Sequence, residues 1–243
     1  MRLFFIALQF ITRVPIGIKA KEEEISRSSL FFPVIGACIG LFLFLIFFLS
    51  SKIFPQNVSI LLVIIASILI TGGFHTEGFI DVCDGFYGGK NKEDILRIMK
   101  DPHCGSMGII GAIILILSKF VILDSIPPLK IFSALVLMGI LSRWAMVFIA
   151  FSSEYARESG TGKVFVEGIK KPDFWLATVF TIVFSILLTG IYGIILMGII
   201  VFITFFLGIF FTKKISGITG DTLGATNEII EVISLLMILF FFK

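Results

Sequence analysis

Long runs of apolar residues alternate with shorter polar stretches along this chain of 243 residues. A helix needs roughly 17–25 mostly apolar residues to cross a bilayer. Seven runs meet or approach this length, so we predict transmembrane helices at about residues 30–50, 58–74, 107–123, 130–151, 174–190, 192–211 and 228–242. The division between the fifth and sixth helices rests only on a weak break, Gly190-Ile191-Tyr192-Gly193.

The N-terminal segment MRLFFIALQFITRVP has an early arginine followed by an apolar stretch. No small-residue cleavage site follows it, so we interpret it as an interfacial helix rather than a signal peptide. The sequence shows no internal repeat and no linker. We therefore expect an all-α, polytopic helix bundle in which residues 1–243 form a single membrane-embedded domain.

The composition agrees with a membrane protein. Hydrophobic residues make up 57% of the chain and charged residues only 15%, whereas soluble domains are about 45–50% apolar. The net charge of +3 is small, which gives no reason to expect nucleic acid as a partner. Three scattered cysteines, Cys38, Cys83 and Cys104, do not form a disulfide framework.

Basic residues gather on one side of the predicted membrane. That side carries Arg2, Arg13, Lys19, Lys21, Arg27, Lys90, Lys92, Arg97, Lys100, Arg157, Lys163, Lys170, Lys171, Lys213 and Lys214, and the other side carries Lys52, Lys130 and Lys243. The positive-inside rule places the first side in the cytoplasm. The long polar stretches also lie there, at 13–29, 75–106, 152–173 and 212–228. We expect a multi-pass protein of the cell (inner) membrane whose active site faces the cytoplasm.

Three carboxylates follow the second predicted span. Glu77, Asp81 and Asp84 are spaced i, i+4 and i+7, which places them on one face of a helix. Their charges repel each other unless a cation lies between them, and oxygen ligands favour Mg²⁺, with Mn²⁺ as the alternative. Such an ion binds phosphate and stabilises a transferring phosphoryl group. The simpler interpretation, a solvated acidic helix end, leaves the neighbouring glycines unexplained.

A second acidic motif, Gly220–Glu228, precedes the last span. Ionisable residues where a helix enters a membrane are candidates for function. We predict Asp221 and Glu228 as further metal ligands, and Thr222 and Asn227 as contacts for substrate hydroxyls. A helix cap at Asp221 or Thr222 is the structural alternative.

Two polar loops on the same side add weaker candidates. Lys100 is suited to a phosphate and Asp101 to a metal or a substrate hydroxyl, although a turn into the third span explains them almost as well. Arg157 lies in a glycine-rich, basic loop that fits a nucleotide or phosphate. The need for positive charge on the cytoplasmic side explains that loop equally well.

Two basic residues, Lys119 and Arg143, lie within predicted spans, where a buried cation needs a partner. Arg143 is suited to an anionic substrate, and Lys119 either extends toward the interface or pairs with a carboxylate. His75 is either a general base or a structural histidine. The spacing of the two histidines and their neighbouring cysteines matches no zinc pattern, so we do not expect zinc.

These stretches together resemble one family, the cobalamin synthases, which are adenosylcobinamide-GDP ribazoletransferases. The resemblance runs over nearly the whole chain. It is most specific in Gly72–Gly85 and in Thr219–Ala225, and it extends to Phe10–Pro15, Phe32–Gly36, Ile98–Gly108, Ser142-Arg143, Tyr155–Arg157 and Gly217–Glu228.

The resemblance implies a Mg²⁺-dependent transferase in a late step of cobalamin (vitamin B12) biosynthesis. Its substrates are adenosylcobinamide-GDP and α-ribazole or α-ribazole 5′-phosphate, and its products are adenosylcobalamin, or its 5′-phosphate, and GMP. A ribose hydroxyl attacks the phosphorus attached to cobinamide. His75 or a cluster carboxylate such as Asp81 or Asp84 accepts the proton, and Arg143 or Lys100 offsets the phosphoryl charge.

Two positions depart from the family pattern. Glu77 stands where the family usually has Asp, and Pro102-His103 where it usually has Ser-Arg. Besides its substrates we expect membrane lipid as a partner; a homo-oligomer and contacts with other cobalamin-assembly enzymes remain open. One alternative is a CDP-alcohol phosphotransferase, whose Ala-Arg is replaced here by Val82-Cys83. The other is an ion-coupled transporter, which the span-end acids and lack of repeats disfavour.

Overall fold

The computed structural model describes residues 1–160 and 162–242, and over that part of the chain it is all-α, as expected. Lys243, counted above on the sparsely charged side, lies outside the described residues. The helices are α1 (Arg2–Ile11), α2 (Glu22–Ser28), α3 (Phe32–Ser50), α4 (Gln56–Thr71), α5 (Phe74–Gly88), α6 (Lys92–Ile98), α7 (Ser106–Ser125), α8 (Ile131–Ser152), α9 (Lys163–Gly168), α10 (Lys171–Thr189), α11 (Ile191–Ile215) and α12 (Gly220–Phe242), with short 3₁₀ turns at Ser29–Phe31 and Pro128–Lys130.

Six helices in the described part of the chain are long and apolar enough to span a membrane, and the bent pair of α4 and α5 makes a seventh if it is counted as one span. Every predicted span corresponds to a helix, so the polytopic bundle is confirmed. The break at Gly190, which has φ of 61°, separates α10 from α11 as predicted. The N-terminal helix is also present, as α1. The polar stretch 75–106, in contrast, contains two further helices, α5 and α6.

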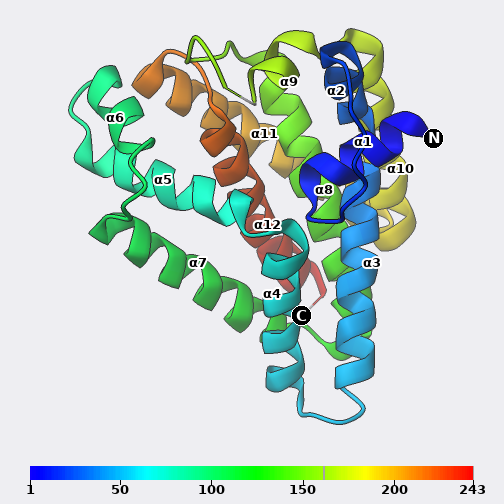
Figure 1. The fold of residues 1–243 in the computed structure, drawn as a ribbon. Coiled ribbons are helices and arrows are strands. Elements are labelled where there is room, and N and C mark those ends of the chain that lie inside the picture. The colour runs from blue at the N-terminus through cyan, green and yellow to red at the C-terminus, as the bar shows by residue number, and fades with distance from the viewer. Residues whose placement is uncertain (161, 243) are drawn as a thin grey trace.

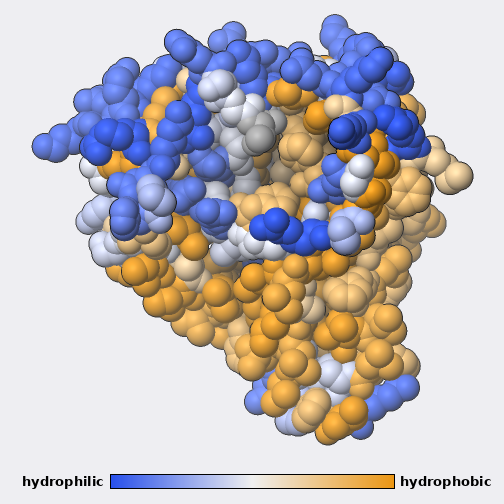
Figure 2. Space-filling view, viewed as in Figure 1, coloured by the Kyte–Doolittle hydropathy of each residue, from blue (hydrophilic) through white to orange (hydrophobic). Residues whose placement is uncertain are grey.

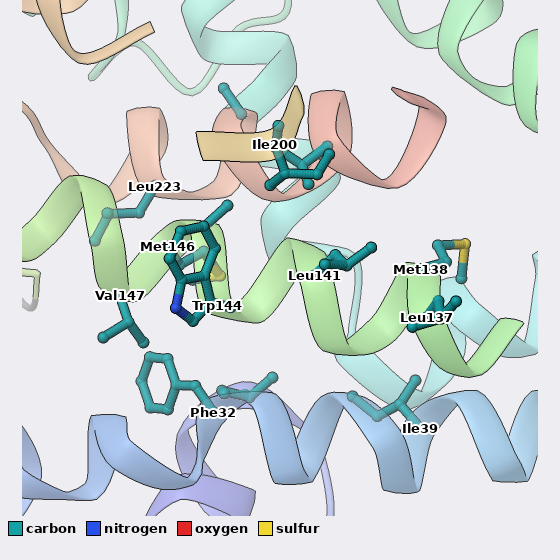
Figure 3. Packing of buried hydrophobic residues seen from close by; sticks show 14 of the residues in the cluster. Phe32, Ile39, Leu137, Met138, Leu141, Trp144, Met146, Val147, Ile200 and Leu223 are labelled. Carbon is teal, nitrogen blue, oxygen red and sulfur yellow. The ribbon is translucent and has the colours of Figure 1, made fainter. Parts of the chain in front are cut away.

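Helix α8 forms the centre of the bundle and packs against α3, α10, α11 and α12 (Figure 1). It is apolar around its whole circumference, which is typical of a buried helix, and nearly all of its residues from Ala134 to Ala150 are buried. Gly36 and Gly139 allow α3 to approach it closely, because a Cβ added at either would collide with the other's carbonyl oxygen. Leu137 and Ile39 lie on facing sides of this contact (Figure 3).

The chain turns sharply between α4 and α5, whose axes differ by 91°. Gly72 and Gly73 occupy the turn with φ of 68° and 74°, a left-handed conformation that glycine adopts without steric cost. Because of this turn α5 runs across the bundle rather than continuing α4, and it packs against α7 and α12 (Figure 1). The segment that carries the predicted acidic face is thereby brought beside the start of the last helix.

The surface divides along the long axis of the molecule. Hydrophilic residues cover the end that bears α2, α6 and α9, a broad hydrophobic band follows, and a small hydrophilic patch ends the opposite side (Figure 2). Many large apolar side chains in the band are exposed, among them Leu117, Leu187 and Phe202. An exposed apolar band of this extent suits contact with lipid.

Candidate functional site

Helices α5 and α12 approach each other closely because each has a glycine at the contact. A Cβ added to Gly78 would lie 2.8 Å from the Asp221 carbonyl oxygen, and one added to Gly224 would lie 2.9 Å from the His75 carbonyl oxygen. Only glycine leaves the backbones room at this distance. The two acidic motifs of the sequence therefore meet across this contact.

A cavity of about 310 Å³ opens beside the contact between α5 and α12. Glu77 and Asp81 line it from α5, and Asp221 lines it from α12. The charges of Asp221 and Glu77 both act on the Asp81 carboxylate. His75 also lines the cavity; its side chain is buried, and neither ring nitrogen has a hydrogen-bond partner among the described residues. The helix face predicted from the sequence is thus present, and two of its three carboxylates face this cavity.

Arg157 comes from the loop after α8 to Asp221, which together with Glu77 and Asp81 forms the acidic wall of the cavity. The loop is held against the α11–α12 turn by an isolated parallel bridge, in which Ala156 N–H donates to the Ile218 carbonyl at 2.8 Å and Ile218 N–H donates to the Glu154 carbonyl at 2.9 Å. This pairing places the Arg157 guanidinium 2.9 Å from an Asp221 carboxylate oxygen. One cation is therefore fixed beside the acidic wall.

Thr222 is buried at the first turn of α12, where its hydroxyl oxygen accepts the Thr219 N–H at 2.8 Å. The hydroxyl in turn donates to the Thr219 carbonyl. Because the Thr219 hydroxyl accepts the Thr222 N–H at 3.3 Å, the two form a reciprocal capping box in which Thr219, and not Asp221 or Thr222, is the cap. The assignment of Thr222 to substrate remains a prediction.

Asp84 faces away from the cavity, toward the start of α7. Its two carboxylate oxygens accept the backbone N–H groups of Gly105 and Gly108, each at 2.7 Å. A negative charge at a helix N-terminus is stabilising, because the first N–H groups lack partners within the helix. Asp84 thus joins α5 to α7, and its predicted roles in metal binding and catalysis remain untested.

The donor set of the cavity fits a hard divalent cation. Within the described residues no three Asp, Glu, His or Cys side chains converge as a complete protein-made metal site does. Mg²⁺ does not require one, since it is usually held by one or two carboxylates together with waters and substrate phosphates. Asp81 and Asp221 supply carboxylate oxygens from two rigid helices, and a cation there would relieve their mutual repulsion.

Glu228, Asn227 and Arg143 belong to a different, buried cluster. Lys119 of α7 pairs with both Glu228 and Glu231 of α12, and Arg143 of α8 pairs with Glu231. Asn227 donates to Glu231 at 3.1 Å, and Thr76 of α5 donates to Glu228 at 3.2 Å. The two cations and two anions balance, as buried charges require. Pairing with a carboxylate was one of the two sequence alternatives for Lys119.

Lys100 lies in an open groove beyond the cavity, with Lys92, Arg97 and Arg157. The charge of Lys100 acts on Asp221, so the groove adjoins the acidic wall. Asp101 is exposed in the following loop, where the His103 N–H and ring hold the pKa of its carboxyl below the usual value. The groove is suited to phosphate, whereas the Asp101 carboxylate is hydrogen-bonded to His103 within its own loop.

The sequence interpretation missed two features. Glu231 is the shared partner of both buried cations, and the rule that cations within spans need partners could have identified it three residues after Glu228. The other is the apolar wall of the cavity, which includes Phe10, Phe32 and Phe165. Nothing separates these three from the remainder of the 29 phenylalanines in the sequence.

The known proteins to which this chain is similar agree on one family. A family model described as cobalamin-5-phosphate synthase matches residues 3–239. Proteins named adenosylcobinamide-GDP ribazoletransferase are similar over nearly the full length: 39% identical in Clostridium kluyveri over 97% of this chain and 95% of the relative, 38% in Clostridium botulinum strain Langeland over 97% and 96%, and 34% in Clostridium tetani over 96% and 94%. No solved structure matches the chain.

Proposed function

The chain belongs to the cobalamin-5-phosphate synthase family, and we propose that the cavity between α5 and α12 is where it joins adenosylcobinamide-GDP to α-ribazole or α-ribazole 5′-phosphate. The observation that carries the proposal is the meeting of Asp81 and Asp221 at one cavity, with Arg157 paired to Asp221 from a third segment of the chain. Carboxylates and a cation at one point are the groups that phosphoryl transfer between two substrates requires.

The reaction forms one phosphorus–oxygen bond and breaks another. A hydroxyl oxygen of the acceptor's ribose attacks the phosphorus that bears cobinamide, and the diphosphate bond breaks to release GMP. The hydroxyl proton passes to a base, for which Asp81 is the candidate because it lines the cavity. Both ring nitrogens of His75, the other candidate from the sequence, are closed off from the cavity. The close contact between α5 and α12 holds Asp81 in place, so much of the catalytic effect comes from positioning.

Arg157 and Lys100 are the cations that we assign to the phosphate groups. Both line the groove next to the cavity, and Arg157 is fixed there by its ion pair with Asp221. A guanidinium also matches the planar arrangement of phosphate oxygens. Arg143, the other candidate for this role from the sequence, pairs with Glu231 within the bundle.

The divalent cation, Mg²⁺ or Mn²⁺, would be held by Asp81 and Asp221, with Glu77 as a further carboxylate at the same cavity. When bound it neutralises phosphate charge and stabilises the departing nucleotide. Glu77 has the longer side chain at a position where the family usually has Asp, so its carboxylate reaches farther from α5.

The family assignment favours this transfer over the two alternatives, a CDP-alcohol phosphotransferase and an ion-coupled transporter. We further propose that the protein lies in the cell (inner) membrane with the cavity open to the cytoplasm. The uneven distribution of basic residues supports this orientation. Soluble substrates would then reach the cavity from the side on which they are made.

The test is to incubate the purified protein with adenosylcobinamide-GDP, α-ribazole and Mg²⁺ and to measure GMP and the cobalamin product. We expect both products in equal amounts, and neither after Mg²⁺ is removed with a chelator. Asp81→Asn and Asp221→Asn should lower the rate at least a hundredfold, on the scale of lost electrostatic stabilisation. Asp124→Asn, at the exposed far end of α7, is the matched control. No GMP from the unaltered protein would overturn the proposal.

A further inference from the structure

The cavity has two walls of opposite character. The carboxylates described above form one wall. The other is apolar and is assembled from α1, α3, α8 and α9, with the residues Phe10, Ile11, Phe32, Met146, Val147, Ala150, Phe165 and Ile169. A site that holds only a metal and phosphate has no use for such a wall, because burying apolar surface against phosphate gains nothing. The second wall therefore indicates an apolar part of a ligand.

Aromatic rings dominate the apolar wall. The Phe165 ring of α9 packs edge-on against Phe10 of α1, with centroids 4.2 Å apart, and lies 5.2 Å from the ring of Phe32. Phe32 extends from α3 toward Val147 of α8 (Figure 3). Three helices thus hold the rings in place, and fixed aromatic faces are favourable for stacking on a flat ligand.

His75 lies between the cavity, which it lines, and the buried ion cluster, whose Arg143, Glu231 and Lys119 charges act on its ring. Its side chain is only 2% exposed, it lines the cavity, and neither ring nitrogen has a partner among the described residues. A buried polar group without a hydrogen bond is costly. Because both ring nitrogens are closed off from the cavity, the hydroxyls of a bound ribose are left to the carboxylates Glu77, Asp81 and Asp221.

The size of the cavity limits what enters it. At about 310 Å³ it lies at the lower end of the range of small-molecule sites, roughly 300–1,000 Å³. A nucleoside fits this space, whereas a corrin macrocycle with its amide side chains does not. Of the groups in the reaction, only the acceptor nucleoside and the guanosine of the donor remain as occupants.

The chemistry of the wall separates these two. Guanine carries hydrogen-bonding groups along its edge, and none of the described side chains that form the apolar wall offers them a partner. Burial against this wall would leave the hydrogen-bonding groups of guanine without partners. The cost of such unpaired groups is what allows a binding site to reject a ligand. The base of ribazole, a dimethylated benzimidazole, has a hydrocarbon edge. An apolar wall can bury this edge without leaving a hydrogen-bonding group unpaired.

We propose that the aromatic wall formed by Phe10, Phe32 and Phe165 binds the base of the acceptor nucleoside and selects alkylated benzimidazoles over purines. This inference rests on the proposed function, since it takes ribazole as the acceptor. The base lies against the rings, and the ribose faces the carboxylates. The nucleotide of the donor then binds in the basic groove around Lys100.

The test is direct binding, which does not depend on turnover. Labelled α-ribazole is dialysed to equilibrium against the purified protein, and the α-riboside of adenine is measured in the same way. We expect the adenine riboside to bind at least tenfold more weakly, given the unpaired polar edge. Equal affinity for the two ribosides would overturn the selectivity.

Variants test the wall itself. Phe10→Leu and Phe165→Leu keep an apolar side chain and remove the aromatic face, so each should weaken α-ribazole binding about tenfold, as expected for a lost stacking contact. Phe10 is only partly buried, so its variant is expected to fold even if the Phe165 variant does not. Phe205→Leu, on the exposed surface of α11, is the matched control and should change nothing.

Kinetics then separate the two proposals. Both wall variants should raise KM for α-ribazole and leave KM for adenosylcobinamide-GDP unchanged. The reverse pattern would place guanine on the wall and overturn the inference, while the transfer reaction would still stand. If the unaltered protein binds α-ribazole through these residues but releases no GMP, the proposed function fails and the base site remains.

Discussion

At the scale of single residues, the three carboxylates of α5 have different surroundings despite their shared helix face. Asp81 lies at the cavity near two other negative charges, whereas both oxygens of Asp84 accept N–H groups at the start of α7. Spacing alone therefore does not determine function. One carboxylate faces the cavity and another joins two helices.

This difference predicts that the same substitution, Asp→Asn, has opposite effects on stability at Asp84 and at Asp81. Asp84→Asn replaces an acceptor oxygen with a donor, so it should destabilise the fold by about 2 kcal/mol, in the range of a charged hydrogen bond. Asp81→Asn removes a charge that its neighbours repel, so it should leave stability unchanged or raise it while abolishing transfer. Thermal unfolding in detergent and the rate of GMP release measure the two effects. Equal stability losses in both variants would contradict this distinction.

The sequence predicted the shared face of Glu77, Asp81 and Asp84 because helical periodicity is a local property. It could not predict the partners of Asp84, since Gly105 and Gly108 are more than twenty residues away and meet it only through the tertiary fold. The aromatic wall was unpredictable for the same reason, because its residues come from three separate helices.

At the scale of helices, the contact between α5 and α12 sets the geometry of the cavity. Gly78→Ala would place a Cβ 2.8 Å from the Asp221 carbonyl oxygen, so the two helices must separate. A shift of about 1 Å commonly costs a hundredfold in rate, and we expect a loss of that order in kcat/KM. Gly198→Ala on α11 is the control, because its Cβ would meet nothing within 4 Å.

The expected stability change distinguishes this effect from unfolding. Both alanine variants gain helix propensity, so Gly198→Ala should be neutral or stabilising and Gly78→Ala only moderately destabilising. Normal transfer by a well-folded Gly78→Ala protein would show that the spacing of α5 and α12 does not govern catalysis.

The buried ion cluster acts at the same scale by joining α7, α8 and α12. Glu231 pairs with both Lys119 and Arg143, so Glu231→Gln leaves Arg143 without its anion. Breaking a buried pair on one side typically costs about 3–5 kcal/mol. The double variant Arg143→Met with Glu231→Gln removes the charge and its partner together, and we expect it to be more stable than the single Glu231→Gln variant.

Chemical unfolding of the two single variants and the double variant gives the coupling between these residues. Additive losses would mean that Arg143 and Glu231 do not stabilise each other. Activity of the double variant tests Arg143 at the same time: retained transfer would assign this arginine to structure, as its burial suggests.

The helix scale also shows where the sequence pattern was sufficient and where it was not. Apolar runs predicted every span, since length and hydropathy are enough to identify a transmembrane helix. They did not predict that α5 and α6 occupy the polar stretch after α4, because neither is long or apolar enough to span. The Gly72-Gly73 pair signalled a break but not the direction of the 91° turn.

At the scale of the whole molecule, the hydrophilic end that carries the cavity and the small hydrophilic patch at the other end lie on opposite sides of the apolar band (Figure 2). Lys52 and Lys130, two of the few basic residues assigned outside, lie near aromatic rings at 4.2 and 4.4 Å. Cys104 lies exposed in the loop before α7, on the side assigned to the cytoplasm. Lys52 and Cys104 are therefore positions at which the orientation of the protein in the membrane can be measured.

We expect Cys104 to react with a membrane-impermeant maleimide only after the cells are permeabilised, because the positive-inside rule places its loop in the cytoplasm. In a Cys104→Ser background, Lys52→Cys should react in intact cells. Desolvation and the neighbouring Asp84 charge raise the pKa of the Cys104 thiol, so less of it is thiolate, the reactive form, at neutral pH. Labelling at mildly alkaline pH gives both positions a comparable chance to react. If Cys104 reacted in intact cells, the orientation in the membrane would be the reverse of the one proposed, and the cavity with its substrates would lie on the outer side.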